Sequence, residues 1–370
     1  MGNCSTVAVI GGGNGALAAA VDLTLKGFRV NLCNPYRGGE SIQPLMADLK
    51  IDYVGVLGQG TASVKRVTAE AREAVVDADL VMICIPATAH EAAAGWLAPV
   101  LSPGMSVLLN PGHTGGALHF LRALREAGYA GRMILGETNT LTYIARKKDV
   151  RTINITGINN VQIAALPAGE IDTLMATVSP CYPDLRPSRT VLGTSLRNLN
   201  AMMHPPVMIL SAAWIEYSSG DFNFYYDAAT PAVARLMKGI DDERLAIGAQ
   251  WGERLEPLID LLVSAGVTTS EARKGDSLQR AFKESLPNRW IKAPSSLDHR
   301  YMHEDIAYGL VPMAALGEIV GVGTPIMRSM IQISSVISGI DYWSWGLNVE
   351  RLGLTGLSPA EVLTFLVHGR

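Results

Sequence analysis

A histidine lies within an apolar stretch that also contains two prolines, "NLNAMMHPPVMIL" at 198–210. In such surroundings the imidazole of His204 needs a polar partner, because an unpaired polar group costs stability. Later in the chain, "DHRYMHEDIAYGL" supplies Asp305, which would fix the tautomer of a nearby histidine, and Arg300, which could grip a carboxylate with two hydrogen bonds. These residue types suit proton transfer on an anionic substrate. The alternative is a core or capping histidine without a catalytic role.

The element that carries His204 is expected to be a helix. Pro205 and Pro206 follow the histidine directly, and proline is favoured at the first position of a helix. The sequence therefore predicts a helix that begins at Pro205, with His204 at its N-terminal boundary. The positive end of the helix dipole would disfavour imidazolium there and keep the ring able to accept a proton.

A second stretch with chemical meaning opens the chain, "TVAVIGGGNGALAAAVDLTLKGFRV". The apolar, β-branched run at 7–10 suits a buried parallel strand, and 17–26 has the composition of a helix. A further strand is expected at 29–33. The glycines between the first strand and the helix thus stand in the context of a dinucleotide-binding fingerprint.

Each small residue of that fingerprint has a physical task. Gly11 permits the sharp turn, Gly13 lets a pyrophosphate approach the backbone, and Ala16 lets the helix pack closely on the strand. The N–H groups at the start of the helix would bind the phosphates. Asn14 and Gly15 complete the expected cofactor contacts.

The end of the second predicted strand bears on cofactor choice. An NAD site usually has an acidic residue there, which binds the ribose 2′-hydroxyl. Here Asn34 takes that place and Arg37 follows, so a 2′-phosphate meets no negative charge. The sequence favours NADP(H) over NAD(H). The alternative is that Arg37 merely points into solvent.

The α/β pattern continues with strands expected at 78–86 and 105–112, separated by a helix. In a doubly wound sheet, ligands bind beyond the carboxyl ends of the strands. We therefore expect Pro86, Thr88 and Asn110 to line the cofactor site.

Three further histidines, His90, His113 and His119, share no metal-ligand spacing, and we expect loop or surface positions for them. No metal site is predicted.

The fold class follows from these patterns. We expect a Rossmann-type, doubly wound parallel sheet at 1–188, with a linker rich in Pro, Ser and Arg at 179–193. Residues 189–370 carry apolar residues at helical spacing, which predicts an all-helical domain for substrate and catalysis.

Composition excludes several function classes. Hydrophobic residues make up 48% of the 370 residues and charged residues 18%, which indicates a large buried core. A net charge of −3 without a long basic run argues against nucleic-acid binding. No uninterrupted apolar segment predicts a membrane span or secretory signal. The scattered cysteines are expected to be reduced, in a cytoplasmic protein that could form a homodimer; they are Cys4, Cys33, Cys84 and Cys181.

The opening "MGNCST" matches an N-myristoylation pattern. Because Thr6 is expected to begin the first strand, little free arm remains, and we expect no acylation.

Taken together, "IGGGNGA", "NLNAMMHPP" and "RYMHEDIAYGLVPMAALGEIVGVGTP" resemble the octopine/nopaline (opine) dehydrogenase family, and "GDFNFYYDAATPAVARLMKGIDDERLAI" is similar to the helical domain of that family. The resemblance covers nearly the whole chain. It implies a C-terminal domain like that of 6-phosphogluconate dehydrogenase. It also implies reductive condensation of an amino acid with a 2-oxo acid such as pyruvate, using NAD(P)H, through an imine.

The resemblance also implies roles for residues. His204, in the context N-x-x-x-H-P that starts at Asn200, would pair with Asp305, and Arg300 would hold a substrate carboxylate. Glu137 would contact and select the side chain of the amino-acid substrate; a surface position without such a role is the alternative.

Two rival functions remain open at this point. One is a simple 2-oxo acid reductase resembling ketopantoate reductase or glycerol-3-phosphate dehydrogenase, and the other is an NADP(H)-binding sensor without catalysis.

Overall fold

The computed structural model describes residues 4–275 and 277–369, so Gly2 of the acylation pattern lies outside the described residues. The chain divides into two compact units. The first contains the chain up to Thr194 together with the last residues from Leu363, and the second runs from Ser195 to Val362.

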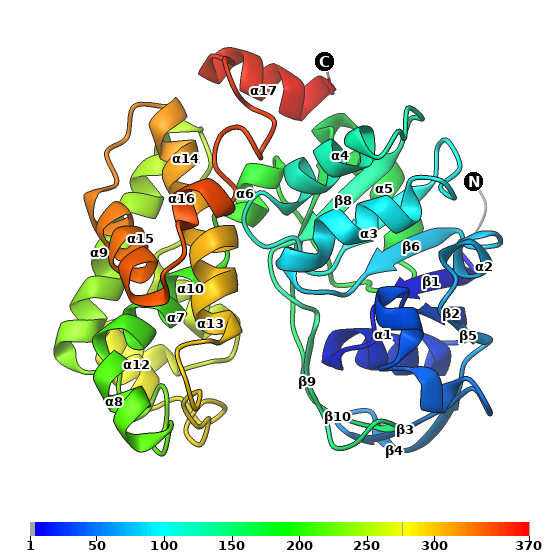
Figure 1. The fold of residues 1–370 in the computed structure, drawn as a ribbon, viewed down its shortest axis with the longest axis horizontal. Helices are drawn as coiled ribbons and strands as arrows, with labels where there is room; N and C mark the ends of the chain where they lie inside the picture. Colours follow the sequence, from blue (N-terminus) through cyan, green and yellow to red (C-terminus); the bar gives the residue numbers. More distant parts are fainter. Residues whose placement is uncertain (1–3, 276, 370) are drawn as a thin grey trace. The chain divides into compact units, whose positions relative to one another are not determined.

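The main sheet of the first unit has eight strands among the described residues, in the order β12-β11-β8-β7-β6-β1-β2-β5 (Figure 1). The strands are β1 (Thr6–Ile10), β2 (Arg29–Cys33), β5 (Arg66–Thr68), β6 (Leu80–Ile83), β7 (Ser106–Leu109), β8 (Ile134–Thr138), β11 (Gln162–Leu166) and β12 (Arg186–Pro187). Neighbouring strands in the series β8-β7-β6-β1-β2-β5 are parallel to one another, whereas β11 runs antiparallel to β8. The predicted doubly wound parallel sheet is confirmed, with an antiparallel strand added near one edge.

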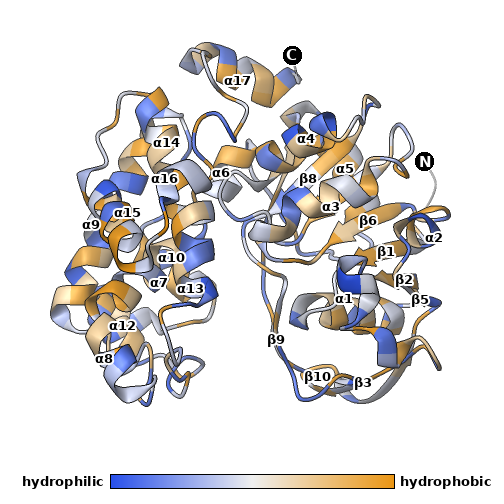
Figure 2. Cartoon of the chain, viewed as in Figure 1, coloured by the Kyte–Doolittle hydropathy of each residue, from blue (hydrophilic) through white to orange (hydrophobic). Residues whose placement is uncertain are grey.

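Buried apolar strands form the centre of this sheet. All residues of β1 and β6 are buried, and β6 is correspondingly orange in Figure 2. Parallel strands covered on both faces require such continuous apolar runs. The helices of the unit are α1 (Asn14–Leu25), α2 (Ala71–Val75), α3 (His90–Leu97), α4 (Gly116–Glu126), α5 (Ile171–Val178) and α6 (Val191–Ser195), with short 3₁₀ turns at η1 (Tyr36–Gly39), η2 (Gln43–Leu45), η3 (Ala87–Ala89) and η4 (Ala168–Glu170).

A second, four-stranded sheet was not anticipated from the sequence. Its order is β4-β3-β10-β9. The strands are β3 (Lys50–Gly55), β4 (Gly58–Ser63), β9 (Tyr143–Lys147) and β10 (Thr152–Ile158). Helix α1 packs against this small sheet as well as against β1 and β2. The hydroxyl of Tyr143 donates a hydrogen bond of 2.7 Å to the buried carboxylate of Asp22, which ties β9 to α1.

The second unit is helical, as predicted. Its helices are α7 (Leu199–Leu210), α8 (Ala212–Ser218), α9 (Pro231–Gln250), α10 (Leu258–Ser264), α11 (Ser270–Lys274), α12 (Leu278–Lys283), α13 (Arg300–Asp305), α14 (Val311–Ile319), α15 (Pro325–Ser338) and α16 (Tyr342–Trp345), with a π-helical segment η5 (Ile306–Leu310). The final helix, α17 (Pro359–His368), runs from this unit into the first. Among the described residues, no helix combines the length and apolar character that a membrane crossing needs.

The division between the units differs from the predicted boundary at 188/189. Thr194 donates a 2.6 Å hydrogen bond to the buried carboxylate of Glu137 on β8, so the chain stays with the first unit until that residue. At the other end, a Cβ built on Gly169 would lie 3.4 Å from the carbonyl of Val367, so α17 ends against the first unit. An amphipathic helix at the chain end does not reveal in its sequence which unit it packs on.

Candidate active site and cofactor cradle

The helix that carries His204 begins earlier than predicted. Helix α7 starts at Leu199 after the N-cap Asn198, and both Pro205 and Pro206 lie inside it. The prediction that His204 marks the N-terminal boundary of a helix was wrong, and with it the argument from the helix dipole. Two prolines remove two N–H donors from the helix, and the continuous burial of residues 201–209 compensates. Tertiary packing therefore overrides the local preference of proline.

Both ring nitrogens of His204 have a partner. Nδ1 lies 2.5 Å from Oδ2 of Asp305, and Nε2 lies 2.6 Å from the hydroxyl of Tyr225. All three side chains are buried. Because a carboxylate only accepts hydrogen bonds, Nδ1 donates to Asp305, and Nε2 is left with the lone pair. Oδ1 of Asp305 has no hydrogen-bond partner among the described residues.

Close helix packing brings this pair together. Asp305 ends α13, and the π-helical η5 follows directly. A Cβ on Gly309 of η5 would lie 2.7 Å from Cβ of Ala201 on α7, so only glycine allows this approach. Single π-helical turns are rare and occur often at functional sites. The sequence stretch "IAYGL" thus sets the distance between Asp305 and His204.

Aromatic side chains surround the His204 ring. Tyr301 stacks on it with ring centroids 3.8 Å apart, and Phe224 meets it edge-on at 6.0 Å. Tyr225 in turn stacks on Phe282 at 5.4 Å. Stacking fixes the plane of the imidazole, so its two nitrogens point at fixed partners.

Arg300 lies at the start of the same helix as Asp305. Its Nη2 forms an ion pair of 2.9 Å with the buried Glu304, while 53% of the arginine side chain is exposed. Partial burial opposes the charge, but Glu304 and Asp305 outweigh it, so the pKa of the Arg300 guanidinium is raised. A guanidinium has five N–H donors, so this arginine remains able to bind an anion.

His299 precedes Arg300 and caps the helix. Its Nδ1 accepts a hydrogen bond of 3.2 Å from the backbone N–H of Tyr301. Burial, and then the charge of Arg300, lower the pKa of His299. The lowered pKa favours the neutral form of the ring, which its accepting role requires.

In the first unit, the glycine turn has the geometry of a phosphate cradle. Gly11 has φ +137°, and a Cβ there would lie 2.4 Å from the carbonyl of Cys84, so no other residue fits. Gly13 is the N-cap of α1 and has open space where a Cβ would be. No side chain caps this helix, and its first turn contains no acidic residue. The turn therefore fits the pyrophosphate of a dinucleotide.

The two residues predicted to select the cofactor lie beyond β2. Asn34 is buried, and its amide donates a hydrogen bond of 2.8 Å to the hydroxyl of Ser41. Arg37 is exposed, and its guanidinium lies over the ring of Tyr36. The position directly after this strand, where an NAD site usually has a carboxylate, is thus occupied by the amide of Asn34.

Other predicted cofactor contacts differ in exposure. Pro86 and Thr88 are exposed beyond the end of β6. Asn110 is fully buried, and its Oδ1 accepts hydrogen bonds from Thr142. Its amide oxygen therefore holds the loop after β8 in place, which does not favour a direct contact with the cofactor.

Two residues next to the glycine turn pack against later parts of the chain. Oδ1 of Asn14 accepts a hydrogen bond of 2.8 Å from the N–H of Lys147. A Cβ on Gly15 would lie 2.8 Å from the side chain of Leu141. Asn14 thus joins the start of α1 to the last residue of β9, and Gly15 packs on the segment that leads into β9.

The side chain of Glu137 likewise makes hydrogen bonds within the first unit. It is fully buried, and its carboxylate accepts hydrogen bonds from the N–H of Ala117 at the start of α4 and from the hydroxyl of Thr194. A carboxylate stabilises a helix N-terminus in this position. The placement does not favour contact with an amino-acid side chain.

The three histidines expected in loops or at the surface are all buried; His113 lies in the loop between β7 and α4, whereas His90 begins α3 and His119 lies within α4, which corrects the prediction for these two. His90, His113 and His119 are at most 5% exposed. The rings of His90 and His113 have centroids 6.5 Å apart. Neither ring nitrogen of His90 has a hydrogen-bond partner among the described residues. Burial, followed by the neighbouring His113 and His119, holds the pKa of His90 well below its usual value.

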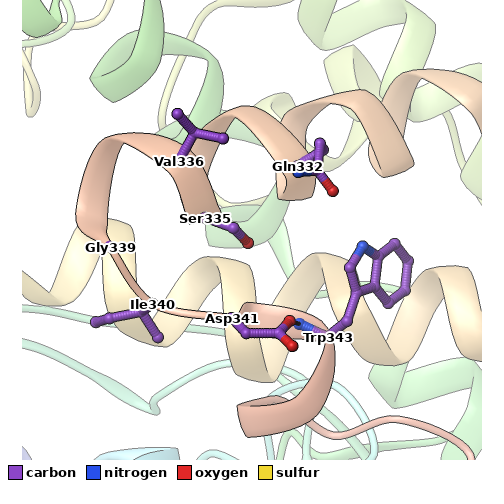
Figure 3. Close-up of a pocket in the computed structure, with 7 residues that line it drawn as sticks. All are labelled: Gln332, Ser335, Val336, Gly339, Ile340, Asp341 and Trp343. Atoms are coloured by element: carbon purple, nitrogen blue, oxygen red, sulfur yellow. Dashed lines mark hydrogen bonds between the residues drawn. The ribbon is translucent and has the colours of Figure 1, made fainter.

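A hollow of about 480 Å³ on the helical unit lies beside the end of α15 (Figure 3). Its lining includes Gln332, Val336 and Trp343, and its single carboxylate, Asp341, caps α16. It contains none of the residues around His204. This hollow is therefore not the site that contains His204 and Asp305.

Sequence reasoning missed the partners of His204 other than Asp305. Tyr225 lies in "GDFNFYYDAATP", where three aromatic residues in a row point to a packed cluster but not to a particular contact. Tyr301 directly follows Arg300, and its position beside a predicted site residue was the available signal.

The fold joins a Rossmann-type sheet domain with a glycine turn to a helical domain that carries the His204–Asp305 pair. A family model described as NAD/NADP octopine/nopaline dehydrogenase, alpha-helical domain, matches residues 187–338. The chain is 33% identical to an opine dehydrogenase from Arthrobacter sp. (strain 1C), over 96% of this chain and 97% of the relative. The chain belongs to the opine dehydrogenase family, NAD(P)-dependent oxidoreductases that act on CH–NH bonds.

Solved structures show the same fold. A structure of octopine dehydrogenase in complex with NADH and agmatine has a TM-score of 0.78 at 19% identity, covering 97% of this chain and 98% of that one. Yersinopine dehydrogenase with NADP⁺ bound has a TM-score of 0.71 at 17% identity, covering 98% and 96%.

Proposed function

We propose that this chain uses NADPH to condense the amino group of an amino acid with a 2-oxo acid such as pyruvate, giving an N-(carboxyalkyl)amino acid. Family membership supports the reaction class. The observation that carries the proposal is the buried His204, which is hydrogen-bonded through Nδ1 to Asp305 at 2.5 Å and whose ring stacks on Tyr301.

His204 moves the protons of the condensation. Attack of an amine on a ketone needs a neutral amine, so a base must remove a proton, and loss of water from the carbinolamine needs an acid. Nε2 of His204 takes the proton from the substrate ammonium and returns it to the leaving hydroxyl. Asp305 stabilises the imidazolium that exists between these two steps. The hydroxyl of Tyr225 bonds to the same nitrogen, at 2.6 Å, and the substrate amine would take the place of this hydroxyl on the Nε2 lone pair.

Arg300 holds a substrate carboxylate. It lies on the helix that ends in Asp305, and one described ion pair uses its Nη2. A planar guanidinium binds a carboxylate with two parallel hydrogen bonds, which fixes orientation as well as position.

The cofactor supplies a hydride to the imine carbon when it is bound. The turn at Gly11 and Gly13 would hold its pyrophosphate against α1, and Pro86 and Thr88 lie beyond the end of β6, on the ligand-binding side of such a sheet. The preference for NADPH is supported by Asn34 in place of a carboxylate and by the exposed Arg37.

We also propose that the enzyme acts in the cytoplasm. Cys4, Cys33, Cys84 and Cys181 are all free and buried, which suits a reducing compartment.

The test follows NADPH oxidation with pyruvate alone, and then with pyruvate plus each amino acid in turn, with product masses recorded. We expect oxidation only when an amino acid is present, with a product whose mass equals the condensed and reduced pair. Oxidation with pyruvate alone would instead indicate a simple 2-oxo acid reductase.

A further inference from the structure

A lysine of the small sheet lies over the glycine turn. Nζ of Lys147, the last residue of β9, donates a hydrogen bond of 2.9 Å to the carbonyl of Gly12 and one of 3.4 Å to the carbonyl of Ser41. The side chain therefore bridges the turn before α1 and the loop after β2. These are the two segments between which a Rossmann-type domain holds the adenosine ribose of its cofactor.

The strand period explains why this lysine points there. Side chains alternate between the two faces of a strand. Tyr143 and Ala145 of β9 are buried and Ile144 and Arg146 are exposed, so Lys147 shares the face of Tyr143. That face packs on α1, because the Tyr143 hydroxyl bonds to Asp22. The backbone N–H of Lys147 also donates to Oδ1 of Asn14, which fixes the strand end at the helix start.

The described partners of this ammonium are two neutral carbonyls. Partial burial lowers the pKa of Lys147, since desolvation disfavours the charged form. An ammonium has three N–H donors, of which two carbonyls use two. Nearby Asn34 is neutral, and Arg37 adds a second exposed cation beyond β2. The charge and the free donor of Lys147 thus suit an anion between the turn and the loop.

We propose that Lys147 binds the 2′-phosphate of NADPH and, together with Arg37, selects NADPH over NADH. This inference rests on the proposed preference for NADPH, but not on the proposed chemistry at His204. A 2′-phosphate at the end of β2 would accept a hydrogen bond from the third N–H of Lys147 and would be attracted by the exposed Arg37 guanidinium.

The experiment measures dissociation constants by calorimetry for NADP⁺ and NAD⁺, and for adenosine 2′,5′-bisphosphate and AMP, without amino acid or oxo acid. Lys147→Met keeps most of the aliphatic stem and removes the charge, and Lys147→Arg retains a charge. Lys148→Met, one residue along, is the matched control. Because the readout is binding, a failure of the condensation reaction leaves this test intact.

We expect Lys147→Met to weaken NADP⁺ and adenosine 2′,5′-bisphosphate by about tenfold to a hundredfold, the value of a hydrogen bond to a charged group. NAD⁺ and AMP should change less than about threefold. Lys147→Arg should restore much of the loss, and the effect should shrink as salt is added. Lys148→Met should bind like the parent.

Three results would overturn the inference. Equal weakening of NADP⁺ and NAD⁺ would assign Lys147 to the pyrophosphate. Unchanged binding with lower thermal stability would make it a purely structural link between β9 and the glycine turn. A parent that binds NAD⁺ as tightly as NADP⁺ would remove the preference that Lys147 is meant to explain.

Discussion

Two buried histidines, one in each unit, differ in how their nitrogens are satisfied. His204 of the helical unit is 3% exposed, and both ring nitrogens have partners, Asp305 and Tyr225. His90 of the first unit is fully buried, and neither ring nitrogen has a hydrogen-bond partner among the described residues. Burial alone therefore does not distinguish a working histidine. The carboxylate at one ring nitrogen of His204 and the hydroxyl at the other are the features that support its proposed catalytic role.

The two histidines also differ in the groups that surround the imidazole ring. His90 lies among His113, His119 and Phe120, so burial and like-charged neighbours both oppose its charged form. At His204 the carboxylate of Asp305 lies 2.5 Å from Nδ1 and the hydroxyl of Tyr225 lies 2.6 Å from Nε2. Only the second arrangement has the hydrogen-bond partners that the proposed proton transfer needs.

The largest effect is expected at His204. His204→Ala removes the proton-transfer group, and kcat should fall by about a hundredfold or more. The dissociation constant of NADPH, measured by fluorescence, should stay close to that of the parent, because the glycine turn is unchanged. A variant with nearly full activity would refute the catalytic role.

Asp305→Asn should have the next largest effect. The amide keeps the shape of the side chain but can donate to Nδ1, which favours the wrong tautomer of His204. We expect kcat to fall by about tenfold or more, because the imidazolium also loses its counter-charge. Steady-state rates across pH measure this, and an unchanged profile would show that Asp305 does not act through His204.

Tyr225→Phe should have a smaller effect. It removes one hydrogen bond to Nε2, worth about 1 kcal/mol, so we expect kcat to fall by about fivefold to tenfold. Tyr301→Phe is the matched control, because it keeps the ring that stacks on His204 and loses a hydroxyl elsewhere. If Tyr225→Phe were as damaging as His204→Ala, the Tyr225 hydroxyl itself would have to carry the proton.

His90 should influence stability and not rate. Its pKa is lowered in the folded protein, so below about pH 6.5 the unfolded chain gains a proton that the folded chain does not. The free energy of unfolding should then decrease by about 1.4 kcal/mol for each further unit by which the pH is lowered. His90→Leu should reduce this slope between pH 6.5 and 5, measured by urea unfolding. Replacement of the exposed His368 by Gln should leave the slope unchanged.

The smallest effect is expected at Arg37. Arg37→Ala should weaken NADPH by about twofold to fivefold, as an exposed cation contributes less than a buried one, and should barely change NADH. Dissociation constants for both cofactors check this. Equal losses would show that Arg37 does not read the 2′-phosphate.

The sequence predicted elements whose signals are local. The glycine turn at Gly11 and Gly13 follows a buried strand and opens α1, because turn, strand and helix all depend on adjacent residues. The pairing of His204 with Asp305 came from the family resemblance, since 101 positions separate the two residues. Spacing alone does not predict such a contact.

What the sequence did not predict depends on long-range packing. Helix α7 continues through Pro205 because its buried surface outweighs two lost backbone hydrogen bonds. The small sheet pairs 50–63 with 143–158, and neither segment shows which partner it takes. Lys147 could therefore not be placed at the glycine turn. The burial of His90, His113 and His119 was not predicted either, because the sequence does not show which segments pack over them.

The central claim is that His204 serves the proton steps of condensation and not the hydride step. NADPH and NADPH deuterated at the transferred position can be compared in the parent and in His204→Ala, with saturating pyruvate and amino acid. If condensation becomes rate-limiting in the variant, its deuterium isotope effect on kcat falls towards one. This is the predicted result. An isotope effect in His204→Ala that exceeds that of the parent would place His204 in the hydride step and contradict the account.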